Sequence, residues 1–215
     1  MSSVLRICPL RNPSAPIPSS RLLCFGALAA AYGVFCLTYL PINAFSVGRP
    51  AHGLFLPGEA QLPFLPDFEF FYALGYVLPL AVVWRAPDRA RLVRLVRAFV
   101  IALAVAYATY LSFPVYFERP HLEVHSLATR LLALEYRDRP YNHFPSLHVA
   151  LGWLVYLACR DRPVIRGTLL PLISAMSIST IFVKQHYLVD ALSGAALAGL
   201  AWWVAGRMTE RRGPR

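Results

Sequence analysis

Two apolar runs with only three residues between them determine how this chain is organised. Residues 167–205 read GTLLPLISAMSISTIFVKQHYLVDALSGAALAGLAWWVA, in which the tripeptide KQH at 184–186 separates run 167–183 from run 187–205. As a helix, a run of this length crosses roughly 25 to 30 Å of hydrocarbon, at about 1.5 Å per residue. The stretch therefore predicts two membrane-spanning helices joined by a tight turn.

The rest of the chain contains four further apolar runs. They cover residues 22–40, 68–84, 98–116 and 146–159, of which the last is short for a membrane span. With 57% hydrophobic and 15% charged residues in 215, the chain is too apolar for an ordinary soluble domain of this size. The first run follows arginines, as in a signal peptide, but its length favours a retained anchor. We predict an all-α polytopic membrane protein with six transmembrane helices in a bundle.

The basic residues predict the orientation of these helices, because arginine and lysine near span ends collect on the cytoplasmic side. Fifteen of the 21 basic residues lie in alternate connections and at the two ends, which places both termini in the cytoplasm. We expect a cytoplasmic tail at 1–21, a membrane domain at 22–208 and a basic cytoplasmic tail at 209–215. This topology accounts for the net charge of +10, and no basic face interleaved with aromatics suggests a nucleic-acid partner.

The remaining connections, at 41–67, 118–144 and 184–186, are then expected on the periplasmic, extracytoplasmic or lumenal side. Residues capable of catalysis gather at the helix ends beside these connections. They lie in the segments YFERP at 116–120, NHFPSLH at 142–148 and QHYLVD at 185–190. Since the topology brings these segments to the same side of the membrane, we expect them to form one site.

In the third segment, His186 and Asp190 stand four residues apart and therefore share one face of a helix. An unpaired carboxylate within an apolar run costs roughly 2.5 to 3.5 kcal/mol on insertion scales, so Asp190 is expected to have a partner. By accepting the proton of one ring nitrogen, Asp190 fixes the tautomer of His186 and leaves the other nitrogen free to attack. Such a pair taken alone is more often structural than catalytic.

In the second segment, Pro145 suits the first position of a helix, because it lacks an amide hydrogen. The amides of Ser146, Leu147 and His148 would then be exposed in the first turn, where the helix dipole favours an anion. With the Ser146 hydroxyl, these amides are predicted to form a phosphate-binding site. His148 is placed to give a proton to a departing oxygen.

Two cations lie near the expected site. The planar guanidinium of Arg119 suits two phosphate oxygens, although an arginine at this place can also serve only as an interfacial anchor. Lys184, in the tight turn, is a second candidate.

Zinc binding is an alternative reading of the histidines. His121 and His125 are four apart, which suits a zinc pair on a helix, but Glu123 is not placed like the glutamate of a metalloprotease helix. A second alternative is a four-ligand zinc site made of His143, His148, His186 and Asp190. We expect neither a metal nor another cofactor.

The three segments resemble the type 2 phosphatidic acid phosphatase superfamily, which contains membrane lipid phosphatases and phosphotransferases and shares its site with soluble vanadium haloperoxidases. The resemblance covers roughly residues 116–199, and the stretches 142–148 and 179–190 look most like the branch of inositol phosphorylceramide synthases. It implies that His186 is a nucleophile forming phosphohistidine, Asp190 orients it and His148 is the general acid. Substrate-binding roles are expected for Arg119, Asn142, Ser146, Leu147 and Lys184.

The chain departs from the lipid phosphatase pattern at two phosphate-binding cations. Ser112 stands where those proteins carry a lysine, and Thr180 stands where they carry an arginine. Either Lys184 and the arginines at 130, 137 and 139 compensate, or the donor is a less charged phosphodiester. We favour the second reading.

The sequence therefore predicts a lipid head-group phosphotransferase of the inositol phosphorylceramide synthase type. Its expected partners are a phospholipid or lipid phosphate donor and an alcohol acceptor, such as inositol or a lipid hydroxyl. With water as the acceptor, the same chemistry would make a lipid phosphate phosphatase. In another class, a non-catalytic lipid-binding or transport protein would explain the missing cations. The sequence does not indicate an oligomeric state.

Overall fold

The computed structural model describes residues 19–85, 88–161 and 163–210, and these residues form helices and connecting loops. Within these ranges the only extended pairing is an isolated bridge between His52 and Val115. The prediction of an all-α protein is therefore confirmed. The tails predicted at 1–21 and 209–215 fall largely outside the described residues.

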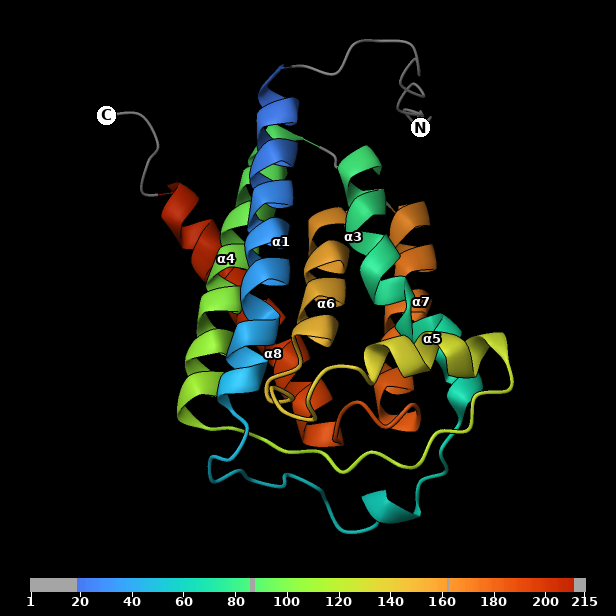
Figure 1. Ribbon diagram of the computed structural model, residues 1–215. Coiled ribbons are helices and arrows are strands. Elements are labelled where there is room, and N and C mark those ends of the chain that lie inside the picture. The colour runs from blue at the N-terminus through green and yellow to red at the C-terminus, as the bar shows by residue number, and fades with distance from the viewer. Residues whose placement is uncertain (1–18, 86–87, 162, 211–215) are drawn as a thin grey trace.

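The longer helices of the described ranges alternate in direction, apart from α5. The described helices are α1 (Ser19–Phe45), η1 (Glu59–Gln61), η2 (Pro66–Phe68), α2 (Glu69–Tyr72), α3 (Leu74–Arg85), α4 (Arg89–Ser112), α5 (Leu127–Glu135), α6 (Leu147–Cys159), α7 (Pro163–Phe182) and α8 (Leu188–Glu210). In Figure 1, α1 begins and α8 ends at the same end of the bundle, and the long loops gather at the opposite end, where α5 lies crosswise. We call the end with the loops the loop end.

Four of these helices are long and apolar enough to cross a membrane. They contain the segments Leu22–Phe45, Arg89–Ser112, Pro163–Phe182 and Leu188–Met208, of 24, 24, 20 and 21 residues. By contrast, α3 has 12 residues and α6 has 13, which gives each a length of roughly 20 Å. The described residues thus show four candidate spans, and the prediction of six stays a prediction.

Three predicted boundaries are wrong for local reasons. The run predicted at 68–84 is split into α2 and α3. Helix α4 begins well before the predicted start at 98, because Asp88 caps it by accepting a hydrogen bond from the Arg91 amide at 2.8 Å. It ends at Ser112 instead of 116, since Pro114 disfavours a helical Phe113.

Small side chains allow the central helices to pack closely. Fully buried alanines line the facing sides of α4 and α8, at Ala98, Ala102, Ala106, Ala198, Ala201 and Ala205. Such residues let helix backbones approach each other where apolar burial alone does not drive association. Helix α6 packs against both α4 and α8, and α1 packs mainly on α4.

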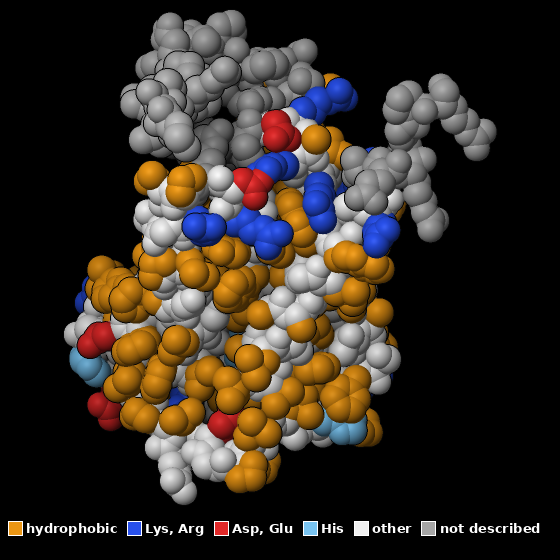
Figure 2. All heavy atoms as spheres, turned by 180° about the vertical axis from the view of Figure 1, so that it is seen from behind, with side chains coloured by type: hydrophobic (Ala, Val, Ile, Leu, Met, Phe, Trp, Pro, Cys, Tyr) orange, Lys and Arg blue, Asp and Glu red, His pale blue; other side chains and the backbone are white. Residues whose placement is uncertain are grey.

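Charge is distributed unevenly along the bundle. Figure 2 shows Lys and Arg side chains gathered towards the end opposite the loop end, next to a largely apolar middle. The first turns of α4 contribute Arg89, Arg91, Arg94 and Arg97 to this end. This is the distribution from which the orientation was predicted.

Candidate active site

Two of the three predicted segments are joined directly at the loop end. The Ser146 amide donates a hydrogen bond to the Asp190 carbonyl oxygen at 3.0 Å, and the Ser146 Oγ lies 3.0 Å from Nε2 of His186. From α4, the Tyr110 hydroxyl donates to the Pro145 carbonyl at 2.9 Å. The start of α6 is therefore held against the start of α8.

A glycine makes this close approach possible. A Cβ on Gly194 would lie 2.4 Å from the Ser146 carbonyl oxygen, so a larger residue in α8 would push the two helix ends apart. Gly199, in the same helix, faces open space, where a Cβ would have no heavy atom within 4 Å.

The turn between α7 and α8 positions His186. The amides of Gln185 and His186 both donate to the Thr180 carbonyl oxygen, at 3.0 and 3.1 Å, and Lys184 adopts a positive φ of 56°. Thr180 is fully buried, and its hydroxyl donates to the Ser177 carbonyl. Thr180, which stands where the lipid phosphatases carry an arginine, therefore supports the turn through its carbonyl oxygen.

His186 and Asp190 lie close together without a hydrogen bond. Nδ1 of His186 is 3.6 Å from Oδ2 of Asp190, which is too long for one. Oδ2 accepts the Tyr187 amide at 2.9 Å, whereas Oδ1 and Nδ1 are buried without partners. Catalytic hydrogen bonds are often long before substrate binds. The predicted pairing is thus present as proximity.

The contact with Ser146 indicates which nitrogen of the His186 ring carries the proton. The Ser146 oxygen accepts the Val149 amide at 3.3 Å, so its hydroxyl hydrogen is free for Nε2 of His186. Nε2 then carries the lone pair and Nδ1 carries the proton, facing Asp190. In this tautomer the lone pair of Nε2 lies beside the Ser146 hydroxyl.

The prediction of the phosphate-binding site is wrong in part. Helix α6 begins at Leu147, with Ser146 as its N-cap, so Pro145 lies before the helix and not in its first position. The Ser146 amide is occupied by the Asp190 carbonyl. The amides of Leu147 and His148 remain in the first turn, where a helix leaves amides without intrahelical acceptors.

His148 is held by α2 and α3. Its ring stacks on Tyr72, with centroids 4.0 Å apart, and Nε2 lies 2.7 Å from the Tyr72 carbonyl oxygen. Gly75 leaves room for this ring, since a Cβ there would lie 2.1 Å from Nε2. A carbonyl only accepts, so Nε2 carries a hydrogen.

Arg119 connects the first predicted segment to the third. Its Nη2 donates to the Asp138 carboxylate at 2.7 Å and to the Gln185 side-chain oxygen at 2.9 Å, and Nε is buried without a partner. Burial raises the pKa of Asp138, and the Arg119 guanidinium opposes this rise. The predicted phosphate ligand is therefore near His186 but shares its charge with a carboxylate.

The other predicted binding residues differ in their surroundings. Asn142, with a φ of 64°, accepts the Ser46 hydroxyl at 3.3 Å, while its Nδ2 is buried without a partner. Leu147 is buried in the core. Lys184 donates to the Leu62 carbonyl at 2.7 Å. All of them belong to the loop end.

One residue of the site was weighed only as a zinc ligand. The His143 ring packs edge-on against His186, with centroids 5.4 Å apart, and its Nε2 is buried without a partner. Burial lowers the pKa of His143 well below its ordinary value, and the neighbouring His186 and Arg119 lower it further. Its place within the segment 142–148 was the available signal.

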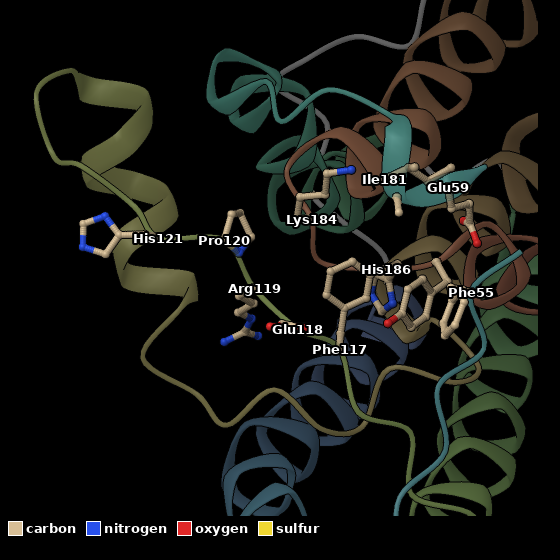
Figure 3. A pocket seen from close by; sticks show the side chains of 12 residues that line it. Phe55, Glu59, Phe117, Glu118, Arg119, Pro120, His121, Ile181, Lys184 and His186 are labelled. Atoms are coloured by element: carbon tan, nitrogen blue, oxygen red, sulfur yellow. The ribbon is translucent and has the colours of Figure 1, made fainter. Parts of the chain in front are cut away.

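Two cavities meet at His186. The first, which we call the outer cavity, has a volume of about 570 Å³ and is lined by Phe55, Phe117, Arg119, Lys184, His186 and Tyr187. Figure 3 shows Phe55, Phe117 and Arg119 coming from two other connections towards the turn that carries Lys184 and His186. The second, which we call the inner cavity, has a volume of about 400 Å³ and is lined in part by Tyr76, Glu135, Asp138, Asn142, His148 and His186.

The zinc alternatives gain no support. His121 and His125 lie in a stretch that is not helical, so the premise of a helical zinc pair was wrong. Within the described ranges, no three or more His, Cys, Asp or Glu side chains are grouped as a metal site.

The protein is all-helical, with four helices long and apolar enough to span a membrane in the described residues. His186, Asp190 and Ser146 are buried together near the guanidinium of Arg119. The sequence profile of the PAP2 superfamily matches residues 54–204, well over half of the chain, and the protein belongs to this superfamily. No curated protein and no solved structure gave a match. Membership makes it a lipid enzyme of the phosphatase or phosphotransferase type, acting on a lipid phosphate.

Proposed function

We propose that this protein is a lipid head-group phosphotransferase of the inositol phosphorylceramide synthase type, working through a phosphohistidine on His186. One observation carries the proposal: Nε2 of His186 is 3.0 Å from the Ser146 hydroxyl, while Nδ1 faces the buried Asp190 carboxylate. This arrangement presents a nucleophilic nitrogen beside a hydrogen-bond donor for phosphate.

In the first step, Nε2 of His186 attacks the phosphorus of the donor lipid. A P–N bond forms, the P–O bond to the leaving group breaks, and the leaving oxygen takes the electron pair and a proton from Nδ1 of His148. Ser146, the first-turn amides of α6 and Arg119 bind the phosphate oxygens. Asp190 stabilises the positive charge that develops on His186 as the phosphohistidine forms.

The charge near His186 favours a phosphodiester donor. Arg119 is already paired with Asp138. The uncharged residues Ser112 and Thr180 stand where the lipid phosphatases carry two cations. The arginines at 130, 137 and 139 are exposed. A phosphodiester carries one negative charge where a phosphomonoester carries up to two, so a single shared guanidinium suits it better.

The alternation of α1, α3, α4, α6, α7 and α8 supports a six-pass topology with both termini in the cytoplasm. The basic end then faces the cytoplasm, and the loop end, with the site, faces the extracytoplasmic or lumenal side (Figures 1 and 2). Residues 22–208 form the membrane domain in this arrangement. The donor approaches from the outer leaflet.

Two other functions remain as alternatives. With water as the acceptor, the phosphohistidine would be hydrolysed, and the protein would be a lipid phosphate phosphatase. If His186 is never phosphorylated, the protein would be a lipid-binding or transport protein that keeps the fold.

The test compares wild type, His186→Ala and His125→Ala at matched membrane levels. His125 is exposed and lines neither cavity, so its variant controls for the loss of a histidine. Membranes receive phosphatidylinositol or phosphatidic acid, with N-octanoylsphingosine, diacylglycerol or inositol as acceptor, and lipids and free phosphate are measured by mass spectrometry and colorimetry. We expect new phospholipid in wild type and His125→Ala only. Free phosphate alone would establish the phosphatase, and three identical samples would overturn catalysis.

A further inference from the structure

We propose that Asp138 restricts the active site to phosphate esters with one negative charge, because it holds Arg119 in an ion pair near His186. Removal of the Asp138 charge should then admit a phosphomonoester that carries two. The inference rests on the proposed function, since it needs a phosphate ester bound at His186. It adds the side chain that selects between a phosphodiester and a phosphomonoester.

The Arg119 guanidinium is held from several sides. Nη2 donates to the Asp138 carboxylate at 2.7 Å and to the Gln185 side-chain oxygen at 2.9 Å, and Nη1 donates to the Asp138 carbonyl oxygen at 3.0 Å. The Tyr136 ring covers one face, with its centroid 4.8 Å from the guanidinium carbon. Of these partners only the Asp138 carboxylate carries a charge, and this charge competes with a phosphate for Arg119.

The position of Arg119 does not depend on that charge alone. The hydrogen bond to the Asp138 carbonyl oxygen belongs to the main chain and is kept by any side chain at position 138. The contacts with Gln185 and Tyr136 also remain, and an asparagine oxygen could still accept from Nη2. Asp138→Asn therefore changes the charge beside Arg119 while the guanidinium stays in place.

The charge of Asp138 also reaches the nucleophile. Burial raises the pKa of Asp138, and the neighbouring Arg119 lowers it most strongly. The Tyr39 hydroxyl and the His186 ring lower this pKa as well. Because an interaction between Asp138 and His186 acts in both directions, an anion bound at His186 is repelled by the carboxylate. Each further charge on the phosphate adds to this repulsion, while the attraction of Arg119 is already shared.

The other charges near the site are more exposed to solvent or are balanced. Burial lowers the pKa of Lys184 and the Glu59 carboxylate raises it, so this cation also has an opposite charge nearby. Arg137 lines the inner cavity but is exposed, and solvent screens its charge. The side chains of Arg119 and Asp138 are only 9% and 17% exposed. Their pair is therefore weakly screened, and a change in its charge should affect a bound phosphate most.

The test compares two donors with matched acyl chains. Dioctanoyl phosphatidylinositol has one phosphate charge, and dioctanoyl phosphatidic acid carries up to two. The second-order rate constant for consumption of each donor is measured in the first turnover, and the ratio of the two constants is the readout. A role of Asp138 in folding alone would change both constants together and leave this ratio unchanged.

Four variants isolate the charge of Asp138. Asp138→Asn removes it, and Asp138→Glu keeps it. Glu118→Gln neutralises an exposed carboxylate that lines the outer cavity but is not a hydrogen-bond partner of Arg119. Glu123→Gln neutralises an exposed carboxylate outside both cavities.

We expect Asp138→Asn to raise the ratio of phosphatidic acid to phosphatidylinositol consumption roughly tenfold at about pH 8. Glu118→Gln should raise it less, because its charge is screened. Asp138→Glu and Glu123→Gln should keep the ratio within about twofold of wild type, even where the first slows both donors. In wild type the ratio should rise as the pH falls from about 8 to about 5, since phosphatidic acid then carries a single charge.

Three results would overturn the inference. They are an unchanged ratio in Asp138→Asn, an equal shift in Glu118→Gln, and a wild-type ratio that does not respond to pH. The last comparison needs no variant, so it decides the matter even if Asp138→Asn does not fold. No consumption of either donor by wild type would instead reject the proposed function.

Discussion

The helix core and the loop end of the bundle differ in how many buried polar atoms lack a hydrogen-bond partner. The core between α4, α6 and α8 is built from alanine and leucine side chains packed at close range. At the loop end, by contrast, lie all the buried side-chain atoms without a partner in the described residues, contributed by Arg49, Glu69, Arg119, Asn142, His143, His186 and Asp190. The core provides stability, and the loop end holds polar groups that a ligand can contact.

This difference has an energetic cost. A buried polar atom without a partner destabilises the fold by about 1 to 3 kcal/mol. Four such atoms belong to Asn142, His143, His186 and Asp190, and His143 and Asp190 both lie next to the His186 ring. The comparison predicts that changes at the loop end and changes in the core separate activity from stability.

The largest effect on activity short of removing the nucleophile is expected from Asp190→Asn. The amide keeps the shape of the carboxylate but cannot stabilise a positive His186, so turnover should fall about 100- to 10,000-fold. Because Asp190 is fully buried and its Oδ1 has no partner, the melting temperature should not fall. Turnover with the donors above and unfolding in detergent are measured together. A variant that melts earlier and keeps its activity would show that Asp190 is structural.

A second prediction concerns two of the three glycines of α8, Gly194 and Gly199. Gly194→Ala places a Cβ against the Ser146 carbonyl and should destabilise the protein by about 1 to 3 kcal/mol, with loss of activity as α6 shifts. Gly199→Ala, in the same helix and facing open space, should be neutral or stabilising by up to about 1 kcal/mol. Thermal unfolding in detergent compares them. Equal effects from both substitutions would contradict the close contact between α6 and α8.

The smallest effect is expected from a buried carboxyl at the loop end. Burial raises the pKa of Glu69 to about 8, and Glu135 adds to the rise. The folded protein therefore holds a proton that the unfolded chain has lost above about pH 4.3. Stability from this group is complete below that pH and falls as the pH rises towards about 8.

Glu69→Gln removes this titration. Its melting temperature should depend less on pH between about 5 and 8, and it should exceed that of wild type at pH 8. Melting curves at several pH values, with Glu123→Gln as an exposed control, measure the difference. A wild-type curve that rises over this range would contradict the raised pKa.

Local chemistry in the sequence was enough to predict most of the long helices and the contact between two of the predicted segments. The apolar runs mark α1, α4, α6, α7 and α8, because helix length and hydropathy are local properties. The i, i+4 spacing of His186 and Asp190 and the segment around Ser146 predicted that these side chains come together. Ser146 and His186 do lie in contact.

The details that tertiary contacts decide could not be predicted. Nothing in the sequence indicates that Arg119 pairs with Asp138, or that the Tyr72 carbonyl and Gly75 hold the His148 ring. The helix α5 was missed because its region is polar and was read as a loop. The break in the second run also escaped, since Glu69 is only one charge in an apolar stretch.

The central claim is that Nε2 of His186 becomes phosphorylated, and trapping the intermediate tests it most directly. Purified protein is mixed with labelled phosphatidylinositol or phosphatidic acid, quenched in base within one turnover, and digested for mass spectrometry. The account predicts an acid-labile, base-stable phosphoryl or phosphoinositol group on Nε2 of His186 in wild type, with none in His186→Ala. Product formation by His186→Ala, or a labelled group on another residue, would contradict it.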